Sequence, residues 1–269
     1  MTSTYAFGEN NGSFAEFELE IQAQSNAGLN LIELEYVEDR WLGVFSDAEA
    51  ATLYTSSSDS AKFDEQLLTI GNQGHKVIDI ERVEDTWIGL LSEDYSPSAF
   101  FSASDFAGFE AEVQTYWEQG YDLSNVEYGE GWWIATFDTS VGSNAYEFSD
   151  NLTQFQLKVE EQADLGFGIV SVEYAEGMWL GVFDEAYAET NVYSLSNSQR
   201  EFQTEFAQRQ AAGFELIDLE VIENQWMGVF SNAAGRNSNA SYENADLINS
   251  INEHQIIDSI TSNLFHPNY

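Results

Sequence analysis

The sequence predicts an α+β repeat protein made of five helix-plus-β-hairpin units, each about 46 residues long. Three observations predict this fold. Tryptophans recur at spacings of 46 or 47 residues, a glycine stands 13 residues before each, and the same strand–turn–strand pattern joins the two. The tryptophans are Trp41, Trp87, Trp133, Trp179 and Trp226, and the glycines are Gly28, Gly74, Gly120, Gly166 and Gly213. Self-similarity at a fixed period is the signature of a repeat architecture.

The repeat sets the expected organisation of the chain. We expect residues 1–240 to form the five-repeat array, with units at about 3–46, 51–92, 98–138, 144–184 and 191–231. Residues 241–269 repeat only the start of a unit, so we expect a C-terminal capping helix and a tail there, because an array needs a cap over its open end. A hydrophobic content of 43% supplies an ample core.

Each unit is expected to begin with a short strand followed by a helix. The strand is predicted by a polar-aromatic stretch, and Ser13 with Glu16 fits a capping box at the start of the first helix. Phe17 and Ile21 form an apolar i, i+4 pair on an otherwise polar segment, which gives one buried stripe. The glycine stands at the same place in every unit, directly after the expected helix. We therefore expect it to end the helix in the left-handed conformation.

A two-stranded hairpin completes each unit, with strands at about 31–37 and 41–45 in the first. A glutamate followed by Asp, Gly or Asn forms the turn in every unit. Glutamate disfavours a type I′ turn, which needs positive φ at both residues, so we expect a three-residue type I turn with a G1 bulge. A two-residue turn is the alternative.

The choice of turn decides which side chains share a face of the sheet. The favoured turn pairs Glu35 with Trp41, so that a carboxylate, an indole and Gly43 share one face and the other, apolar face receives the helix. The alternative places Trp41 with Leu34 and Glu35 beside Leu42, because a slip of one residue reverses every side chain. All strands are expected to form one strongly curved antiparallel sheet with helices outside, as a half-barrel or a five-fold ring.

Repeated carboxylates are the candidate site. A glutamate stands six residues before every tryptophan: Glu35, Glu81, Glu127, Glu173 and Glu220. Indoles beside carboxylates hold sugar rings or cationic groups, so the five tryptophans and five glutamates are the predicted ligand-binding residues. Alternatively, carboxylates coordinate Ca²⁺, with Glu33, Asp79 and Asp218 as the predicted metal ligands. A third, purely structural interpretation has each indole filling the gap over a strand glycine while the glutamates keep the sheet face wet.

The charge of the chain limits its partners. There are 47 acidic residues against 8 basic ones, a net charge of −39, which repels nucleic acids and anionic membranes. The sequence contains no run of about 18 apolar residues, so we expect no insertion into a membrane. Cysteine is absent and only three histidines occur, so we expect no zinc and no cofactor other than Ca²⁺. The N-terminus lacks the features of a conventional signal peptide, although the composition favours an extracellular or cell-surface protein.

The predicted function is a non-enzymatic multivalent binding or accessory module that recognises a glycan or a cationic ligand. No GxSxG, HExxH, P-loop or EF-hand pattern predicts catalysis or a known ion-binding loop. The alternative is a structural component of an extracellular or surface assembly, ordered by Ca²⁺. The partners expected are a glycan, a basic protein, or further copies of the chain pairing through an open sheet edge.

The repeated phrase resembles two tandem-repeat families. Gly120-Tyr121, Gly166-Phe167 and Gly213-Phe214 open the second strand, and Trp-x-Gly closes the hairpin. This is similar to the bacterial tandem-repeat domain found beside hydrolase domains, as in fungal polyglycine hydrolases, and to the C-terminal repeat region of plant casein-kinase-I-like proteins. The first resemblance implies a non-catalytic accessory module with a curved half-barrel sheet. Neither implies particular functional residues.

Overall fold

The computed structural model describes residues 3–8, 12–37, 39–47, 52–83, 85–93, 98–139, 144–188, 190–222 and 224–232. Contacts divide the chain into two compact parts, Met1–Arg236 and Asn237–Tyr269. The capping helix expected within 241–269 lies outside the described residues. Of the helices in the described ranges, none is both long and apolar enough to cross a membrane.

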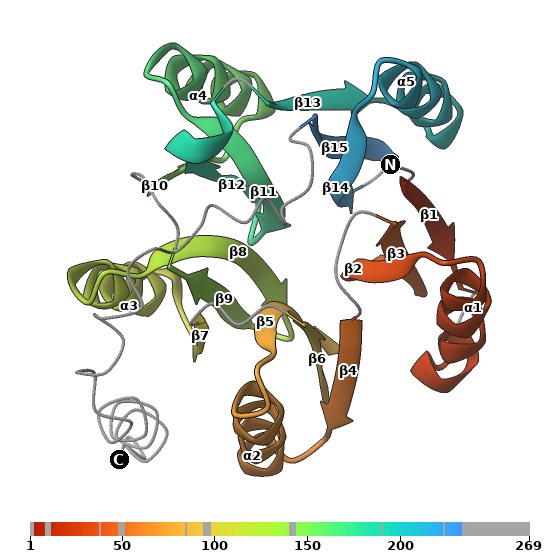
Figure 1. Cartoon of the computed structure of the whole chain (residues 1–269). Helices are drawn as coiled ribbons and strands as arrows, with labels where there is room; N and C mark the ends of the chain where they lie inside the picture. The colour runs from red at the N-terminus through yellow and green to blue at the C-terminus, as the bar shows by residue number, and fades with distance from the viewer. Residues whose placement is uncertain are drawn as a thin grey trace, which may run out of the picture. The chain divides into compact units, whose positions relative to one another are not determined.

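Five units with the order strand–helix–strand–strand follow one another in the first part (Figure 1). The first strands are β1 (Ser3–Phe7), β4 (Thr52–Ser57), β7 (Ser98–Ala103), β10 (Asn144–Ser149) and β13 (Asn191–Ser196). The helices are α1 (Phe14–Asn26), α2 (Ser60–Gly71), α3 (Phe106–Glu118), α4 (Leu152–Asp164) and α5 (Gln199–Ala211). The second strands are β2 (Asn30–Val37), β5 (Lys76–Val83), β8 (Asp122–Gly129), β11 (Gly168–Ala175) and β14 (Glu215–Ile222). The third strands are β3 (Arg40–Ser46), β6 (Thr86–Ser92), β9 (Trp132–Asp138), β12 (Met178–Asp184) and β15 (Gln225–Ser231), and a 3₁₀ turn, η1 (Glu185–Tyr187), follows β12.

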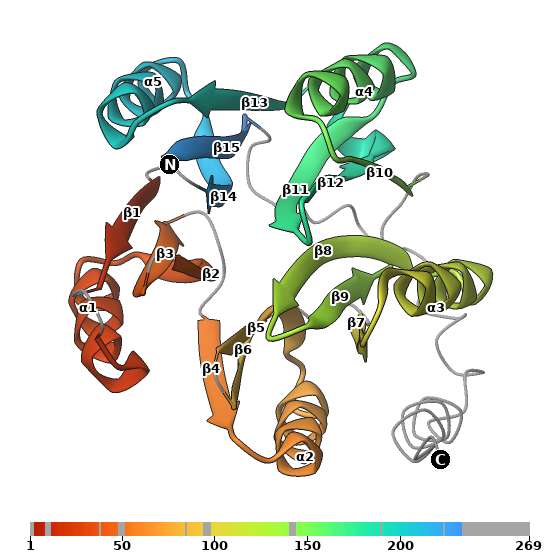
Figure 2. The ribbon, with the colours of Figure 1, turned by 180° about the vertical axis from the view of Figure 1, so that it is seen from behind.

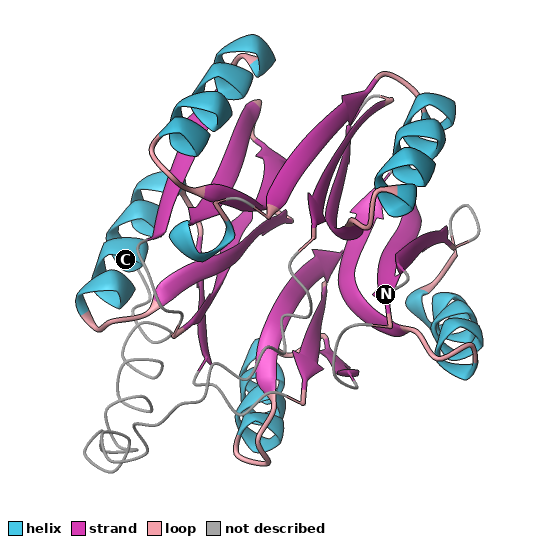
Figure 3. Ribbon diagram, turned by 45° about the horizontal axis from the view of Figure 1, so that its top comes forward, coloured by secondary structure: helices cyan, strands magenta, loops and turns pink. Residues whose placement is uncertain are grey.

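Each unit forms its own three-stranded antiparallel sheet, in which the third strand lies between the first and the second. The five sheets are separate, so the prediction of one curved antiparallel sheet is wrong: neither a half-barrel nor a closed sheet forms from the described strands. The physical reason is that the first and second strands of a unit both pair with its third strand. Both edges of that central strand are therefore occupied within the unit. The second strands face a common centre, and the helices lie at the periphery, as predicted (Figures 1, 2 and 3).

The helix ends follow the sequence-based predictions. The hydroxyl of Ser13 accepts the Glu16 N–H, and the Glu16 carboxylate accepts the Ser13 N–H at 2.9 Å, which completes the predicted capping box. Phe17 faces the sheet and is 1% exposed. Gly28 follows the helix with a φ of +88°, and the equivalent glycines of the other four units also have positive φ. A side chain at these positions would strain the backbone, so glycine is the fitting residue.

The hairpins adopt the alternative, two-residue register. Tyr36 pairs with Trp41 and Val37 with Arg40, and the other four hairpins have the same alignment. The favoured three-residue turn, which pairs Glu35 with Trp41, is therefore wrong. The reason lies in the turn itself: Glu130 has a φ of 52° and the following Gly131 a φ of 81°. Glutamate thus accepts the left-handed conformation, because a two-residue turn with positive φ at both positions matches the twist of the strands.

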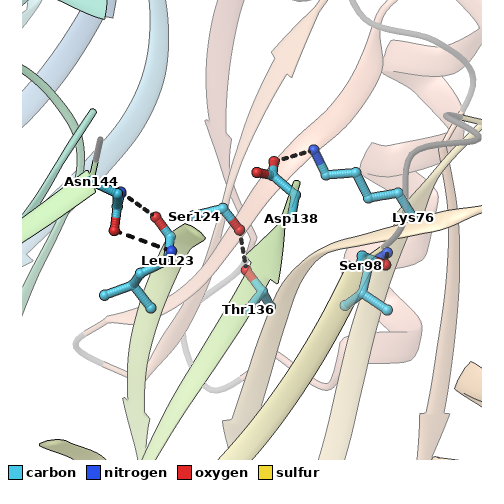
Figure 4. Close-up of polar contacts among 8 residues, drawn as sticks. Lys76, Ser98, Leu123, Ser124, Thr136, Asp138 and Asn144 are labelled. Atoms are coloured by element: carbon cyan, nitrogen blue, oxygen red, sulfur yellow. Dashed lines mark hydrogen bonds and ion pairs between the residues drawn. The ribbon is translucent and has the colours of Figure 1, made fainter. Parts of the chain in front are cut away.

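Each second strand has a β-bulge, and in β5, β8 and β14 hydrogen bonds to the next unit start there. The bulge residue donates its N–H to the first residue of the next unit: Val77 to Ser98 Oγ at 3.1 Å, and Leu123 to Asn144 Oδ1 at 3.1 Å (Figure 4). Asn144 also donates to the Leu123 carbonyl at 2.8 Å. These hydrogen bonds are termed the clasps.

The fifth unit contacts the first through the same clasp. The Leu216 N–H, at the bulge of β14, donates to Ser3 Oγ at 2.9 Å, and Ser3 is 2% exposed. On the same side of the unit, the Ser46 hydroxyl donates to a carboxylate oxygen of Glu215. The first and fifth units, distant in sequence, are therefore neighbours.

Neighbouring sheets pack face to face through apolar clusters. Leu34 and Trp41 of the first unit pack with Ile88 and Leu90 of β6 in the second. The fifth and first units repeat this arrangement, with Leu219 and Trp226 against Leu42 and Val44. The tryptophan face of one sheet thus covers the opposite face of the next, and much of the core lies between units.

Candidate functional site: a central carboxylate cluster

The predicted ligand-binding tryptophans and glutamates lie on opposite faces of the sheets. Trp41 pairs with Tyr36 on the helix-facing side, whereas Glu35 pairs with Leu42 on the other side. The predicted shared face of indole, carboxylate and glycine is therefore wrong. Four of the indoles are 4% exposed or less, namely Trp41, Trp133, Trp179 and Trp226, and Trp87 is half-buried. These rings act as core side chains, and four of them leave almost no surface for a sugar to stack on.

The small residue two positions after each tryptophan makes room for the helix. A Cβ at Gly43 would lie 3.0 Å from Phe17 Cζ and 2.8 Å from Leu31 Cδ1, closer than van der Waals contact allows. At Gly228 it would lie 2.7 Å from Phe202 Cε2. The repeated Trp-x-Gly therefore serves helix-on-sheet packing. The structural interpretation of the motif is wrong in its details: a helix phenylalanine, not the indole, fills the space over the glycine, and the glutamates are buried instead of keeping the sheet face wet.

The five glutamates gather where the second strands face one another. Glu35, Glu81, Glu127, Glu173 and Glu220 are termed the central glutamates, and each is between 5% and 8% exposed. Carboxylate oxygens of Glu35, Glu81 and Glu127 lie within 4.8 Å of one another, and so do those of Glu35, Glu173 and Glu220. The fold thus brings together all five predicted glutamates, away from the tryptophans.

Burial raises the pKa of every central glutamate. Removal from water is the largest cause in each, and neighbouring carboxylates add to it, as Glu220, Glu173 and Glu81 do for Glu35. The pKa of Glu220 rises to about 8. Ion pairs occur elsewhere in the described chain, such as Lys76–Asp138 at 2.5 Å, but none found there includes a central glutamate. Glu220 therefore favours its protonated form at neutral pH, and burial favours that form in the other four, unless a cation replaces the proton.

Polar residues two positions before the central glutamates connect neighbouring units. They are Glu33, Asp79, Asn125, Ser171 and Asp218, termed the inter-unit positions, and all are 9% exposed or less. Asp79 Oδ2 accepts the Leu34 N–H at 2.9 Å, and Asp218 Oδ2 accepts the Val172 N–H at 2.6 Å. In both cases a carboxylate of one unit accepts a backbone N–H of the preceding unit, so two of the three predicted metal ligands already serve as inter-unit acceptors.

An amide and a hydroxyl continue these contacts in the third and fourth units. Asn125 Nδ2 donates to Asp79 Oδ1 at 3.2 Å and to Glu127 Oε1 at 2.9 Å, and Ser171 Oγ donates to Asn125 Oδ1 at 2.6 Å. Asn125 and Ser171 were not among the predicted site residues. Their signal in the sequence was their place in the repeat, where the other three units carry Glu or Asp.

Glu33, the third predicted metal ligand, differs from the other inter-unit positions. It is 4% exposed, and neither carboxylate oxygen has a hydrogen-bond partner of normal geometry in the described residues. Burial raises its pKa most, and the charges of Asp218, Asp79 and Glu220 raise it further, while the Leu219 N–H opposes them. Glu33 therefore brings a buried carboxylate, with the Leu219 N–H as its donor, next to the central glutamates.

The central glutamates offer carboxylate oxygens at distances that suit one kind of metal ion. Ca²⁺ binds oxygens at about 2.3–2.6 Å, so oxygens on opposite sides of the ion lie about 5 Å apart. Oxygens grouped within 4.8 Å fit around such an ion. No known protein family matches the chain, and no curated protein matches it. The resemblance to two tandem-repeat families stays a prediction, and the geometry of the central glutamates becomes the basis for a function.

Proposed function

We propose that the chain is a non-enzymatic structural or binding module, ordered by a divalent cation of the Ca²⁺ type held at the central glutamates. The observation that carries this proposal is the gathering of five buried glutamates from five units with no basic side chain paired to them in the described residues. Burying like charges is costly unless protons or a cation neutralise them.

A cation bound by the central glutamates would cross-link neighbouring units. Glu35 from the first unit and Glu220 from the fifth belong to one group, so an ion there connects the two ends of the array. Oxygen-only ligands favour Ca²⁺ or Mg²⁺ over zinc or copper. Extracellular modules bind Ca²⁺ at about 10⁻⁴–10⁻³ M, and we expect an affinity in that range if the chain works outside the cell, as its composition suggests.

The geometry gives less support to the other predicted function. Recognition of a glycan or cationic ligand through the sheet face needs an indole and a carboxylate together, and the register separates them. A structural role in a surface assembly needs only a stable, strongly acidic array. A net charge of −39 opposes association of copies unless cations screen it, so divalent ions would favour both order and assembly.

Scanning calorimetry with light scattering tests the proposal. The full chain is titrated with CaCl₂, with MgCl₂, and with NaCl at matched ionic strength, after removal of metals with EDTA. We expect Ca²⁺ to raise the melting temperature beyond the NaCl control, because an ion that binds only the folded state stabilises it. An increase in mass with Ca²⁺ would support the assembly role. A response equal to that of matched NaCl contradicts the proposal.

A further inference from the structure

We propose that the contact between the second and third units is the place where the array opens, and that opening there gives access to the central glutamates. The opening itself needs no bound ion, and only its use as a route for an ion rests on the proposed function. Glu81 of the second unit and Glu127 of the third are both buried. An ion needs an entry path to such residues, and separation of these two units would provide one.

At four of the five contacts between neighbouring units, a tyrosine of the first strand has a hydrogen bond with the helix of the preceding unit. Tyr54 Oη donates to Glu18 Oε1 of α1 at 2.9 Å, and Tyr146 Oη donates to Glu110 Oε1 of α3 at 3.2 Å. The other two pairs are Tyr193 with Gln156 of α4 and Tyr5 with Gln203 of α5. These side chains join the units at the periphery, away from the central glutamates.

The contact between the second and third units lacks this hydrogen bond. Phe100 stands where the other four units carry the tyrosine, and it packs with Phe63 and Leu67 of α2. Asp64 of α2 takes the place of Glu18, and its Oδ2 is buried without a hydrogen-bond partner in the described residues. Burial raises the pKa of the Asp64 carboxyl to about 6. A buried acceptor without a partner is unfavourable, so closure of this contact gains less than closure of the other four.

Two more side chains of the second unit are unpartnered on the side that faces the third. Both ring nitrogens of His75 are buried without a partner among the described residues. Leu29, at the same place in the first unit, lines a groove together with Tyr54 of the next unit. Arg82 lies over the ring of Trp132 of the third unit at 5.6 Å, yet its buried Nε and Nη1 have no acceptor in the described chain. The described residues of the third and fourth units contain no such unpartnered atom, so these groups gather at one contact.

An ion pair and a clasp hold this contact closed. Lys76 Nζ of the second unit lies 2.5 Å from Asp138 Oδ2 of the third, and the Val77 N–H donates to Ser98 Oγ (Figure 4). Charges recover their hydration when an ion pair separates, so a partly buried pair adds little net stability. The contact therefore forms, but less free energy opposes its opening than opposes the opening of the others.

Hydrogen exchange of the clasp donors measures the opening of individual contacts. The Val77 N–H reports on the second and third units, the Leu123 N–H on the third and fourth, and the Leu216 N–H on the fifth and first. Exchange is followed by NMR on the ¹⁵N-labelled full chain in EDTA, and the rates are converted into protection factors. We expect the Val77 N–H to be protected about ten- to a hundredfold less than the other two, which is the effect of one hydrogen bond to a charged group.

Two substitutions of one hydroxyl each test the cause. Phe100→Tyr supplies Asp64 with the missing donor and should raise the protection of the Val77 N–H by about ten- to a hundredfold, with the Leu123 N–H unchanged. Tyr146→Phe is the matched control at the next contact, where it removes the donor from Glu110. It should lower the protection of the Leu123 N–H and leave that of the Val77 N–H as it is.

The proposal is wrong if the Val77 N–H is protected as well as the Leu123 and Leu216 N–H groups, or if Phe100→Tyr leaves it unchanged. Repeating the exchange in CaCl₂ separates this inference from the proposed function. A chain that binds no Ca²⁺ but still exchanges fastest at Val77 retains the opening contact and loses the proposed function. A chain that binds Ca²⁺ and exchanges equally at all three positions retains the proposed function and loses the opening contact.

Discussion

Replacing Glu220 with glutamine should stabilise the metal-free protein at alkaline pH. The pKa of Glu220 in the fold is about 8, raised from 4.5 by burial and by Asp218. Because the folded state holds this proton more tightly than the unfolded state, the stability it contributes is complete below pH 4.5 and is lost as the pH rises through 8. Each unit of pKa is worth about 1.4 kcal/mol, so ionising Glu220 in the fold costs about 5 kcal/mol.

Glutamine stays neutral and avoids that cost. Its amide must find new partners, and an unsatisfied buried group costs about 1–3 kcal/mol, which leaves a net gain of about 2–4 kcal/mol at pH 9. At pH 5 the wild-type carboxyl is already protonated in the fold, so the gain should vanish or become a small loss. With saturating Ca²⁺ the order should reverse, because the variant lacks one ligand of the ion.

Urea unfolding followed by tryptophan fluorescence measures these differences, since the tryptophans are core residues. Wild type, Glu220→Gln and the surface control Glu65→Gln are compared in EDTA at pH 5 and pH 9, and then in CaCl₂. The reasoning is refuted if Glu220→Gln is less stable than the wild type at pH 9 in EDTA, since Glu220 would then be a stabilising anion rather than a strained one.

Three further substitutions test the packing. Gly43→Ala should lower the free energy of unfolding in urea by about 1–3 kcal/mol, because its Cβ would overlap Leu31 and Phe17. Gly71→Ala meets open space and should be neutral or slightly stabilising. Equal effects of the two substitutions would contradict the packing described. Ser3→Ala leaves the buried Leu216 N–H without its acceptor and should lower the free energy of unfolding by about 1–3 kcal/mol. The control, Ser56→Ala at an exposed position, should change it by almost nothing. Equal values for both would mean that this hydrogen bond does not join the first and fifth units. Trp133→Ala should cost about 3–5 kcal/mol. On a glycan array, the milder Trp133→Phe should bind as the wild type does, and a specific loss would restore the glycan prediction.

The repeat and its elements could be read from the sequence because they depend on local chemistry. Gly28 ends a helix, Ser13 and Glu16 cap one, and Phe17 packs beneath it, each for reasons contained within a dozen residues. The register could not be read in this way. It depended on whether a turn glutamate accepts positive φ, and Glu130 does so because the twist of the hairpin outweighs its own preference.

The site was predicted as a set of residues but not as a place. The period identified Glu35 and its four equivalents, yet the expected three-residue turn placed them on the tryptophan face, so the wrong face was favoured. Only the arrangement of five sheets shows that these carboxylates have one another as neighbours. The roles of Asn125 and Ser171 depend on the same arrangement, since their partners lie one unit away.

The clasp between the fifth and first units also bears on synthesis of the chain. Ser3 accepts its hydrogen bond from Leu216, 213 residues further along. At about 5–20 residues per second, a ribosome needs about 10–40 s to make that stretch. During that interval β1 and the apolar face beside it lack their final neighbour. A large net charge disfavours association of like chains, so the −39 charge opposes contact between unfinished molecules over the same interval.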